Sequence, residues 1–150
     1  MPTSKPVLLP ANAIFKDCKP GIRYYKLLKL LPTLSPGVSS RPYIDEMDLV
    51  LSKMTDIENK AKLLEKQGKV EQAVELFTQL VEARFDEPHP YIRLCEYYTN
   101  NFQHEKIEQV CSAYIEMAHT LSAMGLGHPY REELIQTFSE IAKKLECNKE

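Results

Sequence analysis

The side chains best suited to chemistry are four cysteines and four histidines, and neither set has the spacing of a reactive site. The cysteines Cys18, Cys95, Cys111 and Cys147 contain no CxxC pair, the spacing that redox and zinc motifs use. His104 and Cys111 lie seven residues apart on one expected helix face, but these two ligands fall short of the four of a structural zinc site. We therefore predict free thiols and no bound metal.

Motifs for other kinds of catalysis are missing from the sequence as well. The chain has no phosphate-binding loop, no nucleophile elbow and no HExxH motif. Glu132 and Glu133 are paired carboxylates, but acids in the first turn of a helix are favoured by the helix dipole. We predict no catalytic residues, no cofactor and no enzymatic activity.

The composition is that of an ordinary globular protein. The chain has 150 residues, of which 43% are hydrophobic and 27% charged, enough for one compact domain with its own core. No apolar run reaches the roughly 20 residues that span a bilayer, so we expect no stable membrane insertion. Pro6 and Pro10 interrupt the first apolar stretch, which is unlike a secretory signal, and the prediction is a cytoplasmic protein.

Charge and proline content divide the chain near Pro42. Residues 1–42 hold seven basic residues and one acidic residue (+6), whereas residues 43–150 hold twelve basic and twenty acidic residues (−8). Seven of the ten prolines also lie in residues 1–42, so we predict a basic, proline-rich arm with one short amphipathic helix at 22–31. The arm either folds back on the acidic body, with Tyr24, Tyr25, Leu27 and Leu28 covering apolar surface, or lies on an anionic membrane. An acidic body repels phosphates, so nucleic acid is not an expected partner.

Residues 43–150 predict a domain made of helices alone. Apolar residues recur at steps of three and four in the segments 43–66, 70–84, 91–99, 103–123 and 130–145. In the first two segments the expected buried face is Met47, Val50, Leu51, Met54, Ile57, Ala61 and Leu64, then Val70, Ala73, Val74, Phe77, Leu80 and Val81. Glycines and prolines stand between the segments and no strand alternation competes, so the fold class is all-α.

Two blocks of 34 residues, 54–87 and 88–121, align without a gap. Ala61 then matches Cys95, and Phe77 matches Cys111. The tripeptide His-Pro-Tyr also recurs, at 89–91 and 128–130, a spacing of 39 residues. We infer that the helix at 103–123 carries about five extra residues.

The first block resembles the tetratricopeptide repeat, whose pattern places Ile57, Ala61, Leu64, Gly68, Ala73 and Phe77 where the family needs large, small, glycine and aromatic residues. The second block departs from the pattern at Ile107, Cys111 and Tyr114, and Phe102 replaces the turn glycine. The resemblance implies an antiparallel array of helix hairpins, about two repeats plus a capping helix. It also implies that Cys95 and Cys111 are buried, inert thiols.

In the resembling family the first helix of each hairpin lines a concave face that binds peptides. On this chain that implies a partner-binding set on two helices: Lys62, Lys66, His89, Arg93 and Asn100. A family subgroup that grips C-terminal carboxylates has a lysine where Glu58 stands, so that specificity is not expected here.

The predicted function is therefore a protein-interaction adaptor that binds a protein or peptide in a helical groove. The alternative is a self-associating structural subunit, for example a homodimer, with the N-terminal arm exchanged or packed on a neighbour.

Overall fold

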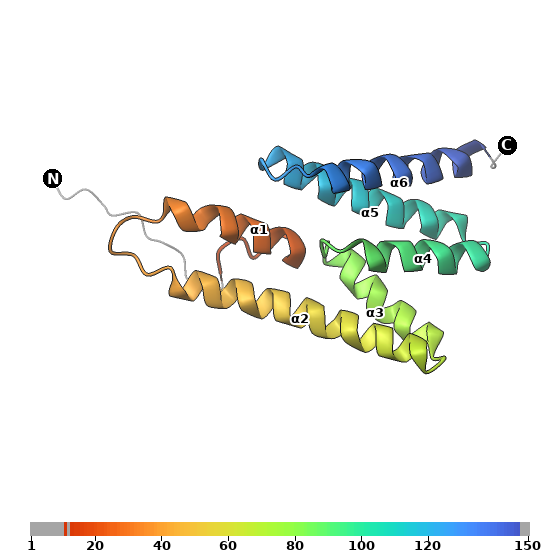
Figure 1. Cartoon of the computed structure of the whole chain (residues 1–150), viewed down its shortest axis with the longest axis horizontal. Helices are drawn as coiled ribbons and strands as arrows, with labels where there is room; N and C mark the ends of the chain where they lie inside the picture. The colour runs from red at the N-terminus through yellow and green to blue at the C-terminus, as the bar shows by residue number, and fades with distance from the viewer. Residues whose placement is uncertain (1–10, 12, 148–150) are drawn as a thin grey trace.

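The computed structural model of this chain describes residue 11 and residues 13–147, and these residues form helices and turns without any strand (Figure 1). The all-α prediction is therefore confirmed for the described residues. The elements in chain order are α1 (Pro20–Leu30), a 3-10 turn η1 (Leu31–Thr33), α2 (Arg41–Lys66), α3 (Val70–Glu82), α4 (Pro88–Asn100), α5 (His104–Ala123) and α6 (Pro129–Cys147).

Local sequence signals set the helix boundaries. A proline occupies the first turn of α1, α2, α4 and α6, where its missing amide hydrogen costs nothing. Gly68 follows α2 with φ +77° and Gly125 follows α5 with φ +80°, the left-handed conformation that ends a helix. The predicted helices lie within about three residues of the observed ones, and the largest difference is that α4 begins at Pro88.

Consecutive helices pack against each other from α2 to α6, and α3 also contacts α5. In Figure 1, α2 lies along one side of the molecule and α6 along the other, with α4 between them. The first helix, α1, packs on α2 and on α5 of the same chain. Helix α1 therefore contacts α5, which follows much later in the sequence, as well as the next helix, α2.

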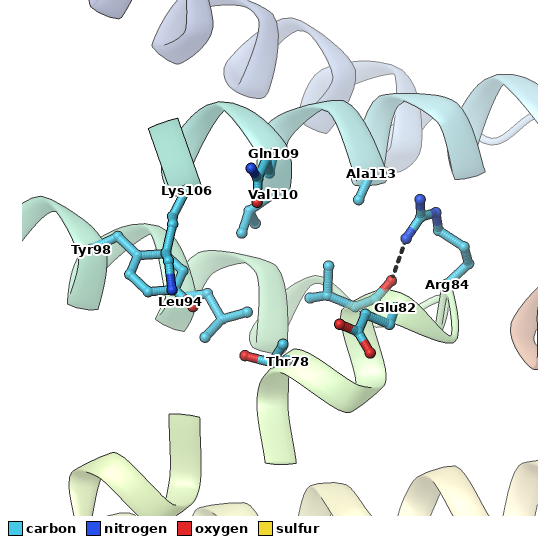
Figure 2. Close-up of a pocket in the computed structure, with 10 residues that line it drawn as sticks. Thr78, Glu82, Arg84, Leu94, Tyr98, Lys106, Gln109, Val110 and Ala113 are labelled. Carbon is cyan, nitrogen blue, oxygen red and sulfur yellow. Dashed lines mark hydrogen bonds between the residues drawn. The ribbon is translucent and has the colours of Figure 1, made fainter. Parts of the chain in front are cut away.

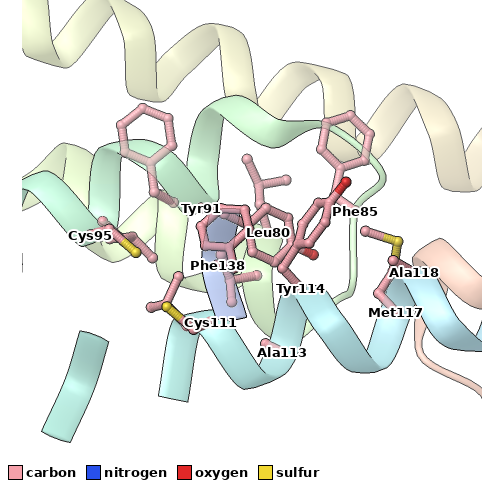
Figure 3. Close-up of a cluster of buried hydrophobic side chains, with 14 of the residues drawn as sticks. Leu80, Phe85, Tyr91, Cys95, Cys111, Ala113, Tyr114, Met117, Ala118 and Phe138 are labelled. Atoms are coloured by element: carbon pink, nitrogen blue, oxygen red, sulfur yellow. The ribbon is translucent and has the colours of Figure 1, made fainter. Parts of the chain in front are cut away.

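A continuous apolar core joins α2 to α6, and a smaller cluster around Leu27 and Tyr43 joins α1 to α2. Three rings meet at the centre of the main core (Figure 3): Tyr114 lies 5.1 Å from Tyr91 and 4.8 Å from Phe138 between ring centroids. Edge and tilted contacts of this kind stabilise a core beyond simple burial. The expected buried faces of α2 and α3 are correct apart from Leu51 and Val70, which are exposed.

Helix α1 fits tightly against the end of α3. The amide of Gly21 donates a 2.7 Å hydrogen bond to the carbonyl of Ala83, and a Cβ on Gly21 would lie 1.9 Å from the Arg84 carbonyl oxygen. Leu27 is fully buried, whereas Leu28 is exposed to solvent. Residues 1–10 and 12 of the predicted arm lie outside the described residues.

Candidate functional site

An apolar groove of about 530 Å³ runs between α4 and α6. On each helix the lining residues follow steps of three and four, so each helix presents one continuous stripe to the groove. The stripe of α4 is Ile92, Cys95, Glu96, Thr99 and Asn100, and that of α6 is Leu134, Thr137, Phe138 and Ile141.

Buried side chains hold the two walls of the groove in place. Phe138 and Cys95 form its floor and are almost fully buried, and the Phe138 ring contacts Tyr91 of α4 at 6.4 Å between centroids. Ile92 stands at the wall with 38% of its surface exposed. A fixed apolar floor with an exposed aliphatic wall suits the side chain of a bound peptide.

A salt-bridge cluster fixes the N-terminal end of α6 against the loop before α4. Arg131 Nη2 lies 2.8 Å from Asp86 Oδ2, and its Nη1 donates to the Leu126 carbonyl. Tyr25 of α1 donates to the same Asp86 oxygen, 2.5 Å away. Burial, followed by this hydrogen bond, raises the pKa of Tyr25 above its ordinary value. The hydroxyl therefore stays protonated and continues to donate to Asp86.

Two of the predicted binding residues come together beside the groove. Arg93 of α4 donates through Nε to Glu65 of α2 at 2.8 Å and through Nη1 to Glu96. The hydrogen bond to Glu65 raises the pKa of Arg93 above its ordinary value, and burial acts in the opposite direction. His89 Nε2 lies 4.0 Å from Glu65 Oε1, and its ring packs edge-on against Phe77. The guanidinium is thus engaged by carboxylates of this chain.

The other predicted residues lie on α2 and at the end of α4. Lys62 donates a 3.1 Å bond to Glu58 one turn away on α2, and Lys66 is exposed at the end of that helix. Asn100 lies at the C-terminal end of the groove on α4. The structure therefore places Asn100 in the groove, Arg93 and His89 beside it, and Lys62 and Lys66 on α2.

Carboxylates also collect near Lys62. Burial, with the negative charges of Glu58 and Asp86 as the next causes, raises the pKa of Glu87 above its ordinary value, and Lys62 opposes this shift. Acidic groups thus outnumber basic ones where α2 faces the start of α4. A ligand carboxylate would meet repulsion there.

A second hollow of about 330 Å³ lies between α3 and α5 (Figure 2). Three of its polar side chains have partners in this chain. Thr78 donates to the Val74 carbonyl, Arg84 donates to the Val81 carbonyl at 2.8 Å, and Lys106 lies over the Tyr98 ring. This hollow is smaller than the α4–α6 groove, at about 330 Å³ against about 530 Å³.

Among the described residues, no group of three or more His, Cys, Asp or Glu side chains is placed to hold a metal ion. All four cysteines are free, and Cys95 and Cys111 are buried together. Within residues 11 and 13–147, no helix is long and apolar enough to cross a bilayer.

Sequence analysis did not find the α6 wall of the groove. The residues Leu134, Phe138 and Ile141 look like one ordinary buried stripe, and Thr137 carries no signal of its own. The repeated His-Pro-Tyr tripeptide was the available hint, because it starts α6 as it starts α4. Which side of α6 faces α4 depends on the length of α5.

Comparison of the chain with protein-family profiles, curated proteins and solved structures gives no match.

Proposed function

We propose that this chain is a protein-interaction module that binds a peptide segment of a partner in the groove between α4 and α6. The observation that carries the proposal is the groove itself, with Phe138 and Cys95 as an apolar floor and Asn100, Thr99 and Thr137 as polar rim groups. An apolar cleft with a few converging polar groups is the usual form of a binding site. No catalytic role is proposed.

The backbone supports the proposal that α2 to α5 form two tetratricopeptide-like hairpins. After α2, the amide of Gly68 donates to the Glu65 carbonyl, and after α4, the amide of Phe102 donates to the Thr99 carbonyl. The next residue in each turn, Lys69 or Gln103, bonds five residues back at 2.9 Å in both cases. The two turns are thus equivalent at a separation of 34 residues, the length of this repeat.

Side-chain charges define the kind of peptide that suits the groove. Arg93 and Lys62 are bound to carboxylates of this chain, and Glu58, Glu65, Glu87 and Glu96 leave the adjoining face acidic. We therefore propose an apolar anchor residue flanked by neutral or basic residues. In this arrangement Asn100 contacts the peptide backbone in the groove, and Lys62, Lys66, His89 and Arg93 lie outside the groove lining, on α2 and α4, where they would contact the flanking residues of the peptide.

Selection from a phage-displayed peptide library, followed by titration calorimetry with the best peptide, tests the proposal. Ile92→Glu places a charge on the groove wall and should weaken binding at least tenfold, about 1.4 kcal/mol. Leu63→Glu is the matched control, because Leu63 is exposed on α2 and lies outside the groove lining. Equal loss in both variants, or none in either, rejects the groove as the site.

Combined replacement of Lys62 and Arg93 by alanine tests the cations outside the groove lining. Weaker binding with unchanged helicity by circular dichroism supports direct contact of these cations with the peptide. Unchanged binding limits the site to the apolar groove and Asn100.

Self-association is the second candidate, and Phe102 favours it. This ring is 85% exposed at the turn between α4 and α5. Contiguous apolar patches on a surface mark interaction sites, and Phe102 is the most exposed of the large apolar side chains among the described residues. Sedimentation velocity over a wide concentration range decides: a dimer that Phe102→Ser dissociates supports self-association, and a monomer throughout rejects it.

A further inference from the structure

A smaller apolar pocket lies where α1 meets the end of α5, away from the α4–α6 groove. Its volume is about 350 Å³, at the lower end of the range for ligand pockets. The lining residues come from the turn before α1, from α1 and η1, and from the residue that follows α5. They are Phe15, Lys26, Lys29, Leu30, Thr33 and Met124, and none of them lines the α4–α6 groove.

Two lysines, three residues apart on α1, bring positive charge to this pocket. Side chains at this spacing lie on the same face of a helix. The Lys26 ammonium lies 5.7 Å from the centroid of the Phe15 ring. The Lys29 ammonium reaches the end of α5, where it lies 3.5 Å from the place that a Cβ on Gly125 would take. One cation is therefore held at the Phe15 wall and the other next to Met124.

No carboxylate of the described residues balances these two charges. Within residues 11 and 13–147, neither ammonium lies in an ion pair, although Arg23 on the same helix pairs with Glu46 at 2.6 Å. Asp17, the nearest acid in the sequence, does not line the pocket. Like charges on adjacent helix turns repel each other. An anion between the lysines would offset this repulsion, and apolar walls would strengthen the attraction.

The walls of the pocket suit an aliphatic chain. Phe15, Leu30 and Met124 are apolar, and a methionine side chain adapts its shape to what it contacts. The stems of the two lysines add further hydrocarbon. The Thr33 hydroxyl already donates to the Leu30 carbonyl at 2.6 Å. The pocket thus combines apolar walls with a pair of cations that lack an anionic partner among the described residues.

We propose that this pocket binds an anionic amphiphile, a single aliphatic chain that ends in a carboxylate. The carboxylate lies between Lys26 and Lys29, and the chain packs against the apolar walls. Because these walls come from both α1 and the end of α5, the bound ligand stabilises the docked position of α1. The site is separate from the α4–α6 groove and does not depend on whether that groove binds a peptide.

An anionic membrane is another partner of the same charge, and the packing of α1 disfavours it. A helix that lies on a membrane keeps its apolar face free to enter the lipid. In α1, Ile22 and Leu27 are buried against the protein instead. The pocket, in contrast, is a hollow that receives a single chain.

Octanoate is the probe, and octylammonium and acetate are matched compounds that lack the negative group or the chain. NMR of the full chain with isotope-labelled methionine methyl groups reports on Met124 in the pocket, while the buried Met47, Met54 and Met117 serve as internal references. We expect octanoate to shift the Met124 signal to saturation and to leave the references in place. Octylammonium and acetate should bind at least about tenfold more weakly, because the lysines repel one and the other has no chain. An unmoved Met124 signal, or equal binding of either matched compound, overturns the proposal.

Charge variants test the lysine pair. Combined Lys26→Gln and Lys29→Gln should weaken octanoate binding about tenfold or more, because the carboxylate loses both cations. Combined Lys53→Gln and Lys60→Gln is the matched control, since both lysines are exposed on α2 outside the pocket. Equal affinity of the two double variants overturns the proposal, as does binding of the wild type to anionic phospholipid vesicles but not to octanoate. The compound series needs no variant, so it decides even if a substitution unfolds the chain.

Discussion

The hydroxyl of Tyr25 on α1 donates a 2.5 Å hydrogen bond to the carboxylate of Asp86, a residue 61 positions later in the chain. Arg131 of α6 binds the same carboxylate, and its guanidinium also lies over the Tyr25 ring, 5.7 Å from the centroid. One carboxylate in the loop between α3 and α4 therefore connects the first helix with the last. Both charged side chains are less than one fifth exposed, so the pair is shielded from water.

Asp86→Asn should destabilise the fold by roughly 3 kcal/mol, because it leaves the shielded Arg131 charge without its partner. Tyr25→Phe removes only the hydrogen bond and should cost about 1–2 kcal/mol. Chemical denaturation followed by circular dichroism measures both. The control is Asp45→Asn, which breaks an exposed pair with Arg41 and should cost less than about 0.5 kcal/mol. Equal effects of Asp86→Asn and Asp45→Asn would contradict the role given to Asp86.

Gly21→Ala should destabilise the protein although alanine is the better helix former by about 1 kcal/mol. The new Cβ would lie 1.9 Å from a backbone oxygen of Arg84. A side chain could relieve such a clash by changing its rotamer, but a backbone atom cannot. Relieving this overlap means shifting α1, at a cost of roughly 1–3 kcal/mol that exceeds the gain in propensity. Gly127→Ala is the control, because the nearest atom there is a serine oxygen at 3.5 Å. A thermal melt of Gly21→Ala at or above the wild-type temperature would show that α1 does not dock as described.

Phe102→Gly should stabilise the chain by up to about 1 kcal/mol. Phe102 has φ +56°, a conformation that is strained for a side chain with Cβ, and it gains little from packing because it is 85% exposed. Gly68 occupies the equivalent place after α2 with φ +77°, so Gly68→Ala should lose about 1 kcal/mol. Urea denaturation of both variants gives the comparison. The same sign for both substitutions would argue against equivalent turns.

Glu58→Gln should lower the pKa of Glu87, measured by NMR titration of the side-chain carboxyl carbon. Burial, the largest cause of the raised pKa, stays in the variant, so the fall is partial. An acid whose folded pKa exceeds its unfolded value destabilises the fold in its ionised form. Its contribution to stability is therefore lost as pH rises from the ordinary glutamate pKa through the raised one. Glu58→Gln should reduce this loss of stability. Glu71→Gln, on the exposed side of α3, is the control and should leave the pKa of Glu87 unchanged. An unchanged Glu87 pKa in Glu58→Gln would show that the two carboxylates do not interact.

Helix positions could be predicted closely because their signals are local. Prolines in first turns and glycines after last turns act within a few residues, as at Pro129 and Gly68. Leu51 and Val70 show the limit of this reasoning: both continue an apolar pattern, yet both are exposed, because no later helix covers those positions.

The partners of charged residues could not be predicted in this way. Arg93 has a carboxylate within its own helix at Glu96, which spacing reveals, but its contact with Glu65 of α2 depends on how two hairpins stack. Arg93, which the sequence predicts to bind a peptide, is thus bound by two carboxylates of its own chain. Glu65 itself gave no signal of that role in the sequence.

By itself, the sequence determined that this chain is helical and where each helix begins and ends, because backbone hydrogen bonds and apolar periodicity act over three or four residues. The tertiary structure decided that α4 and α6 face each other across a groove and that Asp86 joins α1 to α6. Each of these depends on the relative position of helices far apart in the chain. That position is set by how side chains of several helices fill one core together, which no short stretch of sequence specifies.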